Sequence, residues 1–101
     1  MSILKAAFIF VAPNAKPAEH RSWVRTEQVH LLSVAVNNYK QAAEVAAELV
    51  KTDDIAAIEL CGGFGHAGAA AVAAAVNVPV GVVRFDGHPG LGNVSGDTLF
   101  K

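Results

Sequence analysis

The chain has 101 residues, of which 52% are hydrophobic and 17% are charged, and its formal net charge is −1 at pH 7. This length supports one domain with one core, and this composition excludes an intrinsically disordered chain. The eight Lys and Arg residues form no basic stripe, which argues against nucleic acid or an anionic membrane as a partner.

The first third of the chain predicts two strands separated by a short helix. Residues 3–12 form a nearly continuous apolar run that Pro13 ends, which is typical of a strand buried on both faces. Residues 17–27 carry a proline in the first turn of a predicted short helix. Residues 29–36 predict the second strand.

The strongest helix signal follows directly. Asn37 and Asn38 are candidate N-caps, and Gln41 follows Asn38 by three residues, as in a capping box. Apolar residues then recur at helical spacing and predict one buried face. These residues are Tyr39, Ala42, Ala43, Ala46, Leu49 and Val50.

The second half of the chain repeats the alternation of strand and helix. Residues 55–60 predict a third strand, residues 69–76 an alanine-rich helix, and residues 78–85 a fourth strand. The glycine-rich residues 86–101 predict a loop or tail. We therefore expect one α/β domain over residues 1–101. It should contain a mainly parallel sheet of about four strands, flanked by helices in a Rossmann-like or flavodoxin-like three-layer arrangement.

A glycine-rich loop lies between the third strand and the helix that follows it. Residues 63–68 match Gly-x-Gly-x-x-Gly, and Asp86 lies near the position where a dinucleotide fold places its ribose acid. Backbone N–H groups at such a helix start favour a bound phosphate or carboxylate. A dinucleotide site is a weaker alternative, because the chain lacks a second nucleotide-binding half. The structural interpretation of the same glycines is a tight turn with close packing of the helix on the sheet, and it stands beside the anion site as a full alternative.

Loops that follow parallel strands share one edge of the sheet, so the segments 61–66 and 84–88 should converge there. Arg84 would supply a positive charge for an anionic ligand. A buried ion pair between Glu59 and Arg84 is the structural alternative for these two residues. The predicted ligand-binding residues are Gly62, Gly63, Phe64, Gly65, His66, Arg84 and Asp86.

Four side chains are candidates for proton transfer or nucleophilic attack. His66 and His88 are candidate acid–base groups, Glu59 is a candidate base, and Cys61 at a helix start is a candidate nucleophile. These residues have no recognised metal-ligand spacing, so we assign no metal site, and the sequence specifies no cofactor. The single cysteine permits no internal disulfide, which fits a cytoplasmic protein.

Two segments resemble a known family. Residues 58–66 (Ile-Glu-Leu-Cys-Gly-Gly-Phe-Gly-His) and residues 79–90 (Pro-Val-Gly-Val-Val-Arg-Phe-Asp-Gly-His-Pro-Gly) are similar to a family of small prokaryotic proteins of unknown function. The resemblance covers the whole chain and implies a single α/β domain. It implies no reaction.

Two functions from different classes follow from these patterns. The first is a cytoplasmic protein that binds a small anionic metabolite at the strand ends, with or without acid–base chemistry. The second is a non-catalytic homo-oligomer whose glycine loops are packing turns. The high apolar content of a domain this small predicts self-association, most simply as a dimer through a strand edge or the alanine-rich helix.

Overall fold

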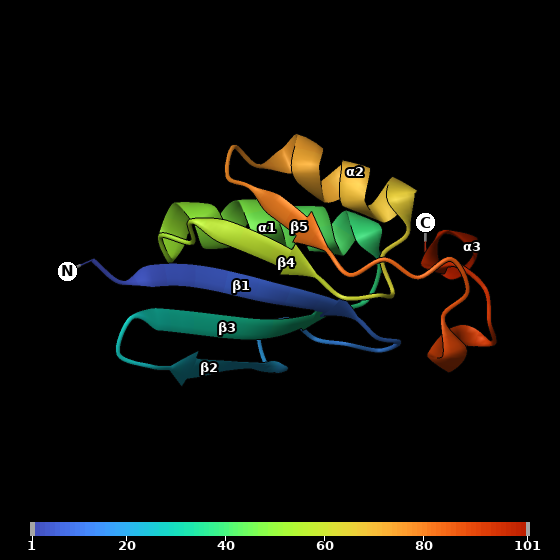
Figure 1. Cartoon of the computed structure of the whole chain (residues 1–101), viewed down its shortest axis with the longest axis horizontal. Coiled ribbons are helices and arrows are strands. Elements are labelled where there is room, and N and C mark those ends of the chain that lie inside the picture. The colour runs from blue at the N-terminus through green and yellow to red at the C-terminus, as the bar shows by residue number, and fades with distance from the viewer. Residues whose placement is uncertain (1, 101) are drawn as a thin grey trace.

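A five-stranded sheet forms the centre of the computed structural model, which describes residues 2–100 (Figure 1). The strands lie in the order β2-β3-β1-β4-β5, with β2 antiparallel to β3 and every other pair parallel. This mostly parallel sheet confirms the α/β class, with one strand more than predicted. The strands are Leu4–Val11 (β1), Arg21–Arg25 (β2), Val29–Val36 (β3), Ala57–Leu60 (β4) and Val80–Val82 (β5).

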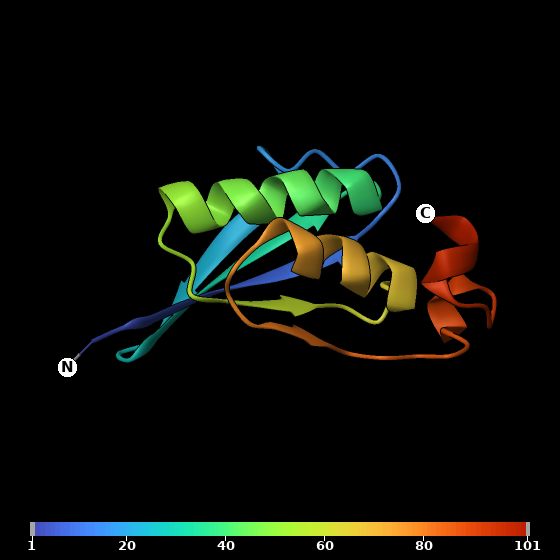
Figure 2. The same cartoon turned by 90° about the horizontal axis from the view of Figure 1, so that it is seen from above.

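The two long helices, Tyr39–Thr52 (α1) and His66–Ala75 (α2), pack side by side on the same face of the sheet (Figures 1 and 2). The crossovers β3-α1-β4 and β4-α2-β5 both step across the sheet in one direction. Because such crossovers are right-handed, both helices come to lie on one face. The expected three-layer arrangement is therefore wrong: the described chain has two layers, and the second face of the sheet carries no helix.

Local signals set the start of α1. The Asn38 side chain accepts a hydrogen bond from Gln41 N–H at 2.8 Å, and Gln41 Oε1 accepts one from Asn37 N–H at 2.6 Å. The apolar stripe of the helix packs on the inward-facing side chains of β1, β3 and β4. The largest fully buried side chains are Phe64, Ile9, Leu32, Leu49, Ile55, Ile58, Leu60, Val34, Val36 and Val72.

Residues 17–27 do not form the predicted helix. Residues Arg21–Arg25 are an edge strand instead, and Trp23 lies in register with Leu32 and packs against the core. Tertiary pairing with β3 outweighs a weak local helix preference here, because burial of the indole ring contributes more than helix propensity does. The strand at residues 3–12 is also buried on one face only, since Phe10 remains 36% exposed.

The C-terminal segment is folded rather than a loose tail. It contains a 3-10 turn at Pro89–Leu91 (η1) and a short helix at Gly96–Leu99 (α3), which packs against α2. The strand predicted at residues 78–85 is shorter, at Val80–Val82. Among the described residues, no helix has the length and apolar character needed to cross a bilayer.

Candidate functional site

The loops after β4 and β5 meet at the carboxyl edge of the sheet, as their topology predicts. Val83 N–H donates to the Leu60 carbonyl at 3.0 Å. A Cβ atom added at Gly62 would overlap the Phe85 ring and lie 3.0 Å from the His88 ring. The absence of a side chain at Gly62 thus allows the second loop to lie directly on the first.

The backbone donors of the glycine loop already have partners within the chain. Gly63 N–H donates to Cys61 Sγ at 3.2 Å, and Phe64 N–H donates to the Cys61 carbonyl at 3.1 Å. Gly65 N–H donates to the Tyr39 hydroxyl at 2.9 Å. The expectation that these N–H groups are free to receive a ligand is therefore wrong for these three donors.

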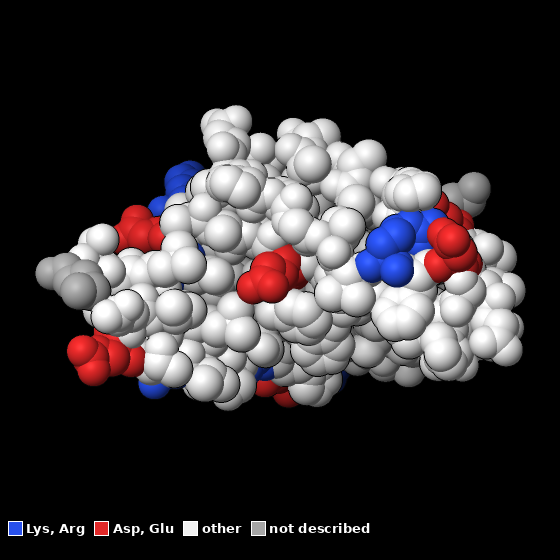
Figure 3. Space-filling model, viewed as in Figure 1, with Lys and Arg blue, Asp and Glu red and all other residues white. Residues whose placement is uncertain are grey.

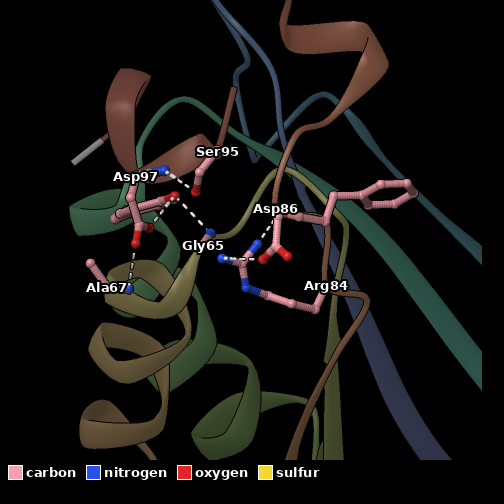
Figure 4. A network of polar contacts seen from close by, with 8 residues as sticks. Gly65, Ala67, Arg84, Asp86, Ser95 and Asp97 are labelled. Atoms are coloured by element: carbon pink, nitrogen blue, oxygen red, sulfur yellow. Dashed lines mark hydrogen bonds and ion pairs between the residues drawn. The ribbon is translucent and has the colours of Figure 1, made fainter. Parts of the chain in front are cut away.

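A carboxylate from the C-terminal segment occupies the start of α2. Gly65 is the N-cap residue and has no side chain that could accept a hydrogen bond. Asp97 caps the helix instead. Its Oδ2 accepts a hydrogen bond from Ala67 N–H at 3.1 Å, and its Oδ1 lies 3.1 Å from the Tyr39 hydroxyl oxygen (Figure 4). Ser95 Oγ accepts from Asp97 N–H at 3.2 Å and holds the backbone of α3 in place.

The Tyr39 side chain contacts α2, the glycine-rich loop and the C-terminal segment. Its ring stacks on the fully buried Phe64 with centroids 5.3 Å apart, and it meets the Phe100 ring at 6.4 Å. A Cβ atom at Gly68 would lie 2.6 Å from the Tyr39 ring, so the last glycine of the motif permits close packing of α2 on α1. Burial raises the pKa of the Tyr39 hydroxyl, so this group stays protonated at neutral pH.

Arg84 lies on the other side of the same edge (Figure 4). Its guanidinium donates to the Phe85 carbonyl and lies 3.4 Å from Asp86 Oδ1. Arg84 Nε is buried without a hydrogen-bond partner among the described residues. The positive charge of Arg84 offsets a small part of the rise in the pKa of Tyr39 and helps to lower the pKa of Asp97, so it acts on both groups at the start of α2.

Glu59 is not where the sequence analysis expected it. It is exposed on the face of the sheet that has no helices, and within residues 2–100 it forms no ion pair with Arg84. The reason is strand parity: Ile58 and Leu60 point into the core, so the residue between them must point away from it. The expected buried Glu59–Arg84 pair is therefore wrong.

The remaining candidate side chains lie at the predicted edge, and within residues 2–100 no hydrogen bond or ion pair joins them to one another. His66 is the exposed first residue of α2, and the side chain of Asp86 is 98% exposed. His88 Nδ1 accepts from Gly90 N–H at 2.9 Å, so this nitrogen caps η1. Within residues 2–100, no three His, Cys, Asp or Glu side chains lie close enough together to hold a metal ion.

The hydrogen bonds at the start of α2 control the ionisation of Asp97. Partial burial alone would raise the pKa of this carboxyl group, but the donors outweigh it. The N–H of Ala67 and the hydroxyl of Tyr39, followed by the N–H of Gly68 and the charge of Arg84, hold the pKa below its ordinary value of 3.8.

We expect the contribution of Asp97 to stability to depend on pH. Because its folded pKa is lowered, its stabilisation is complete above the unfolded pKa of about 3.9 and is lost as the pH falls through the folded pKa. Asp97→Asn should lower the free energy of unfolding by about 1 kcal/mol at pH 7. Urea titrations should show this difference shrinking below about pH 4. A stability difference between Asp97→Asn and the wild type that persists at pH 2 would contradict the role of the charge. The control is Glu44→Gln, which removes a carboxylate from the exposed side of α1.

Two residues of the site, the hydroxyl group of Tyr39 and the carboxylate of Asp97, are absent from the predicted site residues. Tyr39 was assigned only to the buried face of α1, because its position in the helical period says nothing about its hydroxyl group. The available signal for Asp97 was Ser95-Gly96-Asp97, a serine N-cap followed by an acidic residue in the first turn of a helix.

Three hollows in the described surface lie away from the glycine loop. Two of them, of about 730 and 410 Å³, lie at the amino-terminal edge of the strands and share Lys5 and Asp54. A third, of about 390 Å³, lies beside Phe10 on the sheet face without helices. None of the three includes Asp97 or Arg84 among its lining residues.

The fold and the edge site define a two-layer α/β protein whose helix start is capped by its own C-terminal segment. Residues 4–98 match the model of a family described as "Family of unknown function (DUF6506)", so the chain belongs to this family. The comparisons with curated proteins and with solved structures gave no match.

Proposed function

We propose that the carboxyl edge of the sheet binds a small anionic metabolite, with a phosphate or carboxylate group, in exchange for the Asp97 side chain. The observation that supports this proposal is the Asp97 carboxylate itself, which lies 3.1 Å from Ala67 N–H at the start of α2. A helix start attracts anions through its dipole and its free N–H groups. The local geometry therefore suits a carboxylate, whatever molecule carries it.

Two features favour exchange over permanent occupation. The segment that carries Asp97 is short, and most residues from 85 to 99 are exposed, so the main apolar contact that its local release breaks is that of Phe100 with Tyr39. Arg84 adds a positive charge beside the same edge, and its Nε has no partner in the described chain. An incoming phosphate would gain a charge-assisted hydrogen bond from the exposed part of this guanidinium group.

The proposal concerns binding and includes no reaction. Glu59 lies on the other face of the sheet, and His88 Nδ1 already accepts a hydrogen bond from Gly90. The Gly-x-Gly-x-x-Gly pattern gives little support to a dinucleotide. Two of its glycines serve internal packing: Gly65 lies against Asp97, and Gly68 lies against Tyr39.

The alternative function is a non-catalytic, homo-oligomeric protein in which the glycine loop is only a packing turn. The observation that favours it is the internal pairing of the donors of Gly63, Phe64 and Gly65. In that case Asp97 is a permanent cap that closes the edge. Both functions are proposed for a cytoplasmic protein, which fits the unpaired Cys61.

Calorimetric titration with inorganic phosphate and with succinate separates the two functions. Asp97→Ala removes the internal competitor, so it should bind phosphate at least about tenfold more tightly than the wild type does. Adding Arg84→Ala should reverse this gain, because the bound anion loses its cation. Glu44→Ala removes the same charge from an exposed position on α1 and should leave binding unchanged. If neither the wild type nor Asp97→Ala binds either anion, the alternative function stands.

A further inference from the structure

One whole face of the sheet has no covering element in the described chain. We call it the open face. Strand parity places on it the residues that alternate with the core-facing ones, because successive side chains of a strand point to opposite faces. The open face consists of Leu4, Ala6, Phe8, Phe10, Ser22, Val24, Val29, Leu31, Ser33, Ala35, Ala57, Glu59 and Gly81.

The open face is apolar where a solvent-facing sheet would carry polar side chains. Leu4 is 46% exposed, Phe10 36%, Val24 60% and Val29 39%. Figure 3 looks onto this face and shows mostly uncharged atoms, with one acidic group near the middle and a basic group beside an acidic one toward the right. Parallel strands are normally covered on both faces, and exposed apolar patches of this kind mark interaction sites.

We propose that the open face is the interface with a second copy of this chain, packed sheet against sheet about a two-fold axis. Five strands about 4.8 Å apart and about six residues long cover roughly 24 by 20 Å. Two such faces, treated as flat, bury about 1,000 Å² in total. This area reaches the lower end of the range for specific protein interfaces, and protruding side chains add to it. The proposal is independent of the anion site, which lies at the strand ends.

The charge of the open face favours a copy of itself over a charged macromolecule. Glu59 is the single charged side chain that the described strands place on it. The hollow on this face adds one acid and one base, Glu19 and Arg21, so the face offers no net basic surface to a nucleic acid or an anionic membrane. Glu59 selects the direction of the two-fold axis. Glu59 and Ser33 lie in one row on either side of Phe8 in β1.

A two-fold axis that runs along β1 places β4 of one copy over β3 of the other. Each Glu59 carboxylate then faces a serine hydroxyl, which can donate a hydrogen bond to it. An axis across the strands at this row would instead bring the two Glu59 carboxylates together, which like-charge repulsion disfavours. Of these two axes, the one along β1 is favoured, with strands that run in the same direction on both sides of the interface.

Two substitutions on the open face and one control test the proposal. Phe10→Lys places a charge near the carboxyl end of β1, and Val24→Lys does so on the exposed edge strand β2, where the fold tolerates the change most easily. Val82→Lys is the matched control. Val82 is a strand valine with 48% exposure, but its register with the buried Leu60 places it on the helix side.

Sedimentation equilibrium should report the wild type at twice the chain mass of 10.5 kDa at micromolar concentration. Each open-face variant should raise the dimer dissociation constant at least about 100-fold, because the two-fold axis buries the new charge twice. Val82→Lys should leave it unchanged, and circular dichroism should show that all variants are folded. A monomeric wild type at about 100 μM would overturn the proposal, and so would a dimer that survives Val24→Lys in folded protein.

Discussion

The Tyr39→Ala variant is expected to be about 4 kcal/mol less stable than the wild type. Tyr39 is 5% exposed, stacks on Phe64 and contacts Phe100. Its removal leaves a cavity between α1, α2 and the C-terminal segment, and the rigid sheet beneath limits collapse into that space. Urea unfolding followed by circular dichroism measures the loss.

Tyr39→Phe is the matched control that separates the ring from the hydroxyl group. It keeps the stacking on Phe64 but leaves the buried Gly65 N–H without its acceptor and removes the hydroxyl donor from Asp97 Oδ1. We expect this variant to lose about 1–2 kcal/mol. Equal stability of Tyr39→Phe and the wild type would contradict the role of the hydroxyl group, and a loss below 1 kcal/mol for Tyr39→Ala would contradict the central position of the ring.

Replacing Gly96 with alanine should detach the C-terminal segment from the domain. Gly96 is buried, and a Cβ atom there would overlap the Gly63 carbonyl oxygen and lie 2.8 Å from the Tyr39 hydroxyl. The obstacle is backbone, so no side-chain rotation relieves it. We expect a loss of about 2–3 kcal/mol in the free energy of unfolding.

Amide hydrogen exchange gives the sharper measurement for Gly96→Ala. Release of α3 removes Asp97 from Ala67, so the Ala67 amide should lose protection while the amides of β1 and β3 keep theirs. Gly81→Ala is the matched control, because a Cβ atom there meets no atom within 4 Å. Unchanged exchange at Ala67 in Gly96→Ala would show that the tail adapts without detaching.

Local signals account for the elements that the sequence predicted well. The strand at residues 29–36 and the start of the helix at Tyr39 were confirmed. In both cases the decisive information lies within a few residues: alternation and β-formers in the strand, and the Asn38 cap in the helix. The convergence of the loops at Gly62 and Phe85 also followed from the sequence, because parallel strand order alone brings those strand ends together.

The misassigned elements depended on distant partners. Residues 21–25 became a strand because β3 offers a free edge and the core offers space for Trp23. The apolar run at residues 3–12 looked buried on both faces, since the sequence does not record on which face the helices lie. Glu59 was expected in the core for the same reason, although strand parity was readable from its neighbours.

The sequence by itself determined the α/β class, the stable helix at residues 39–52 and the edge where the chemistry-bearing loops gather. Only the tertiary structure decided that both helices cover one face and that the glycine loop is closed by the chain itself. The Ala67–Asp97 hydrogen bond spans 30 residues, a separation at which no periodic pattern carries information. The physical reason is that hydrophobic periodicity and capping are local, whereas the filling of a helix start and the covering of a sheet depend on where the rest of the chain folds.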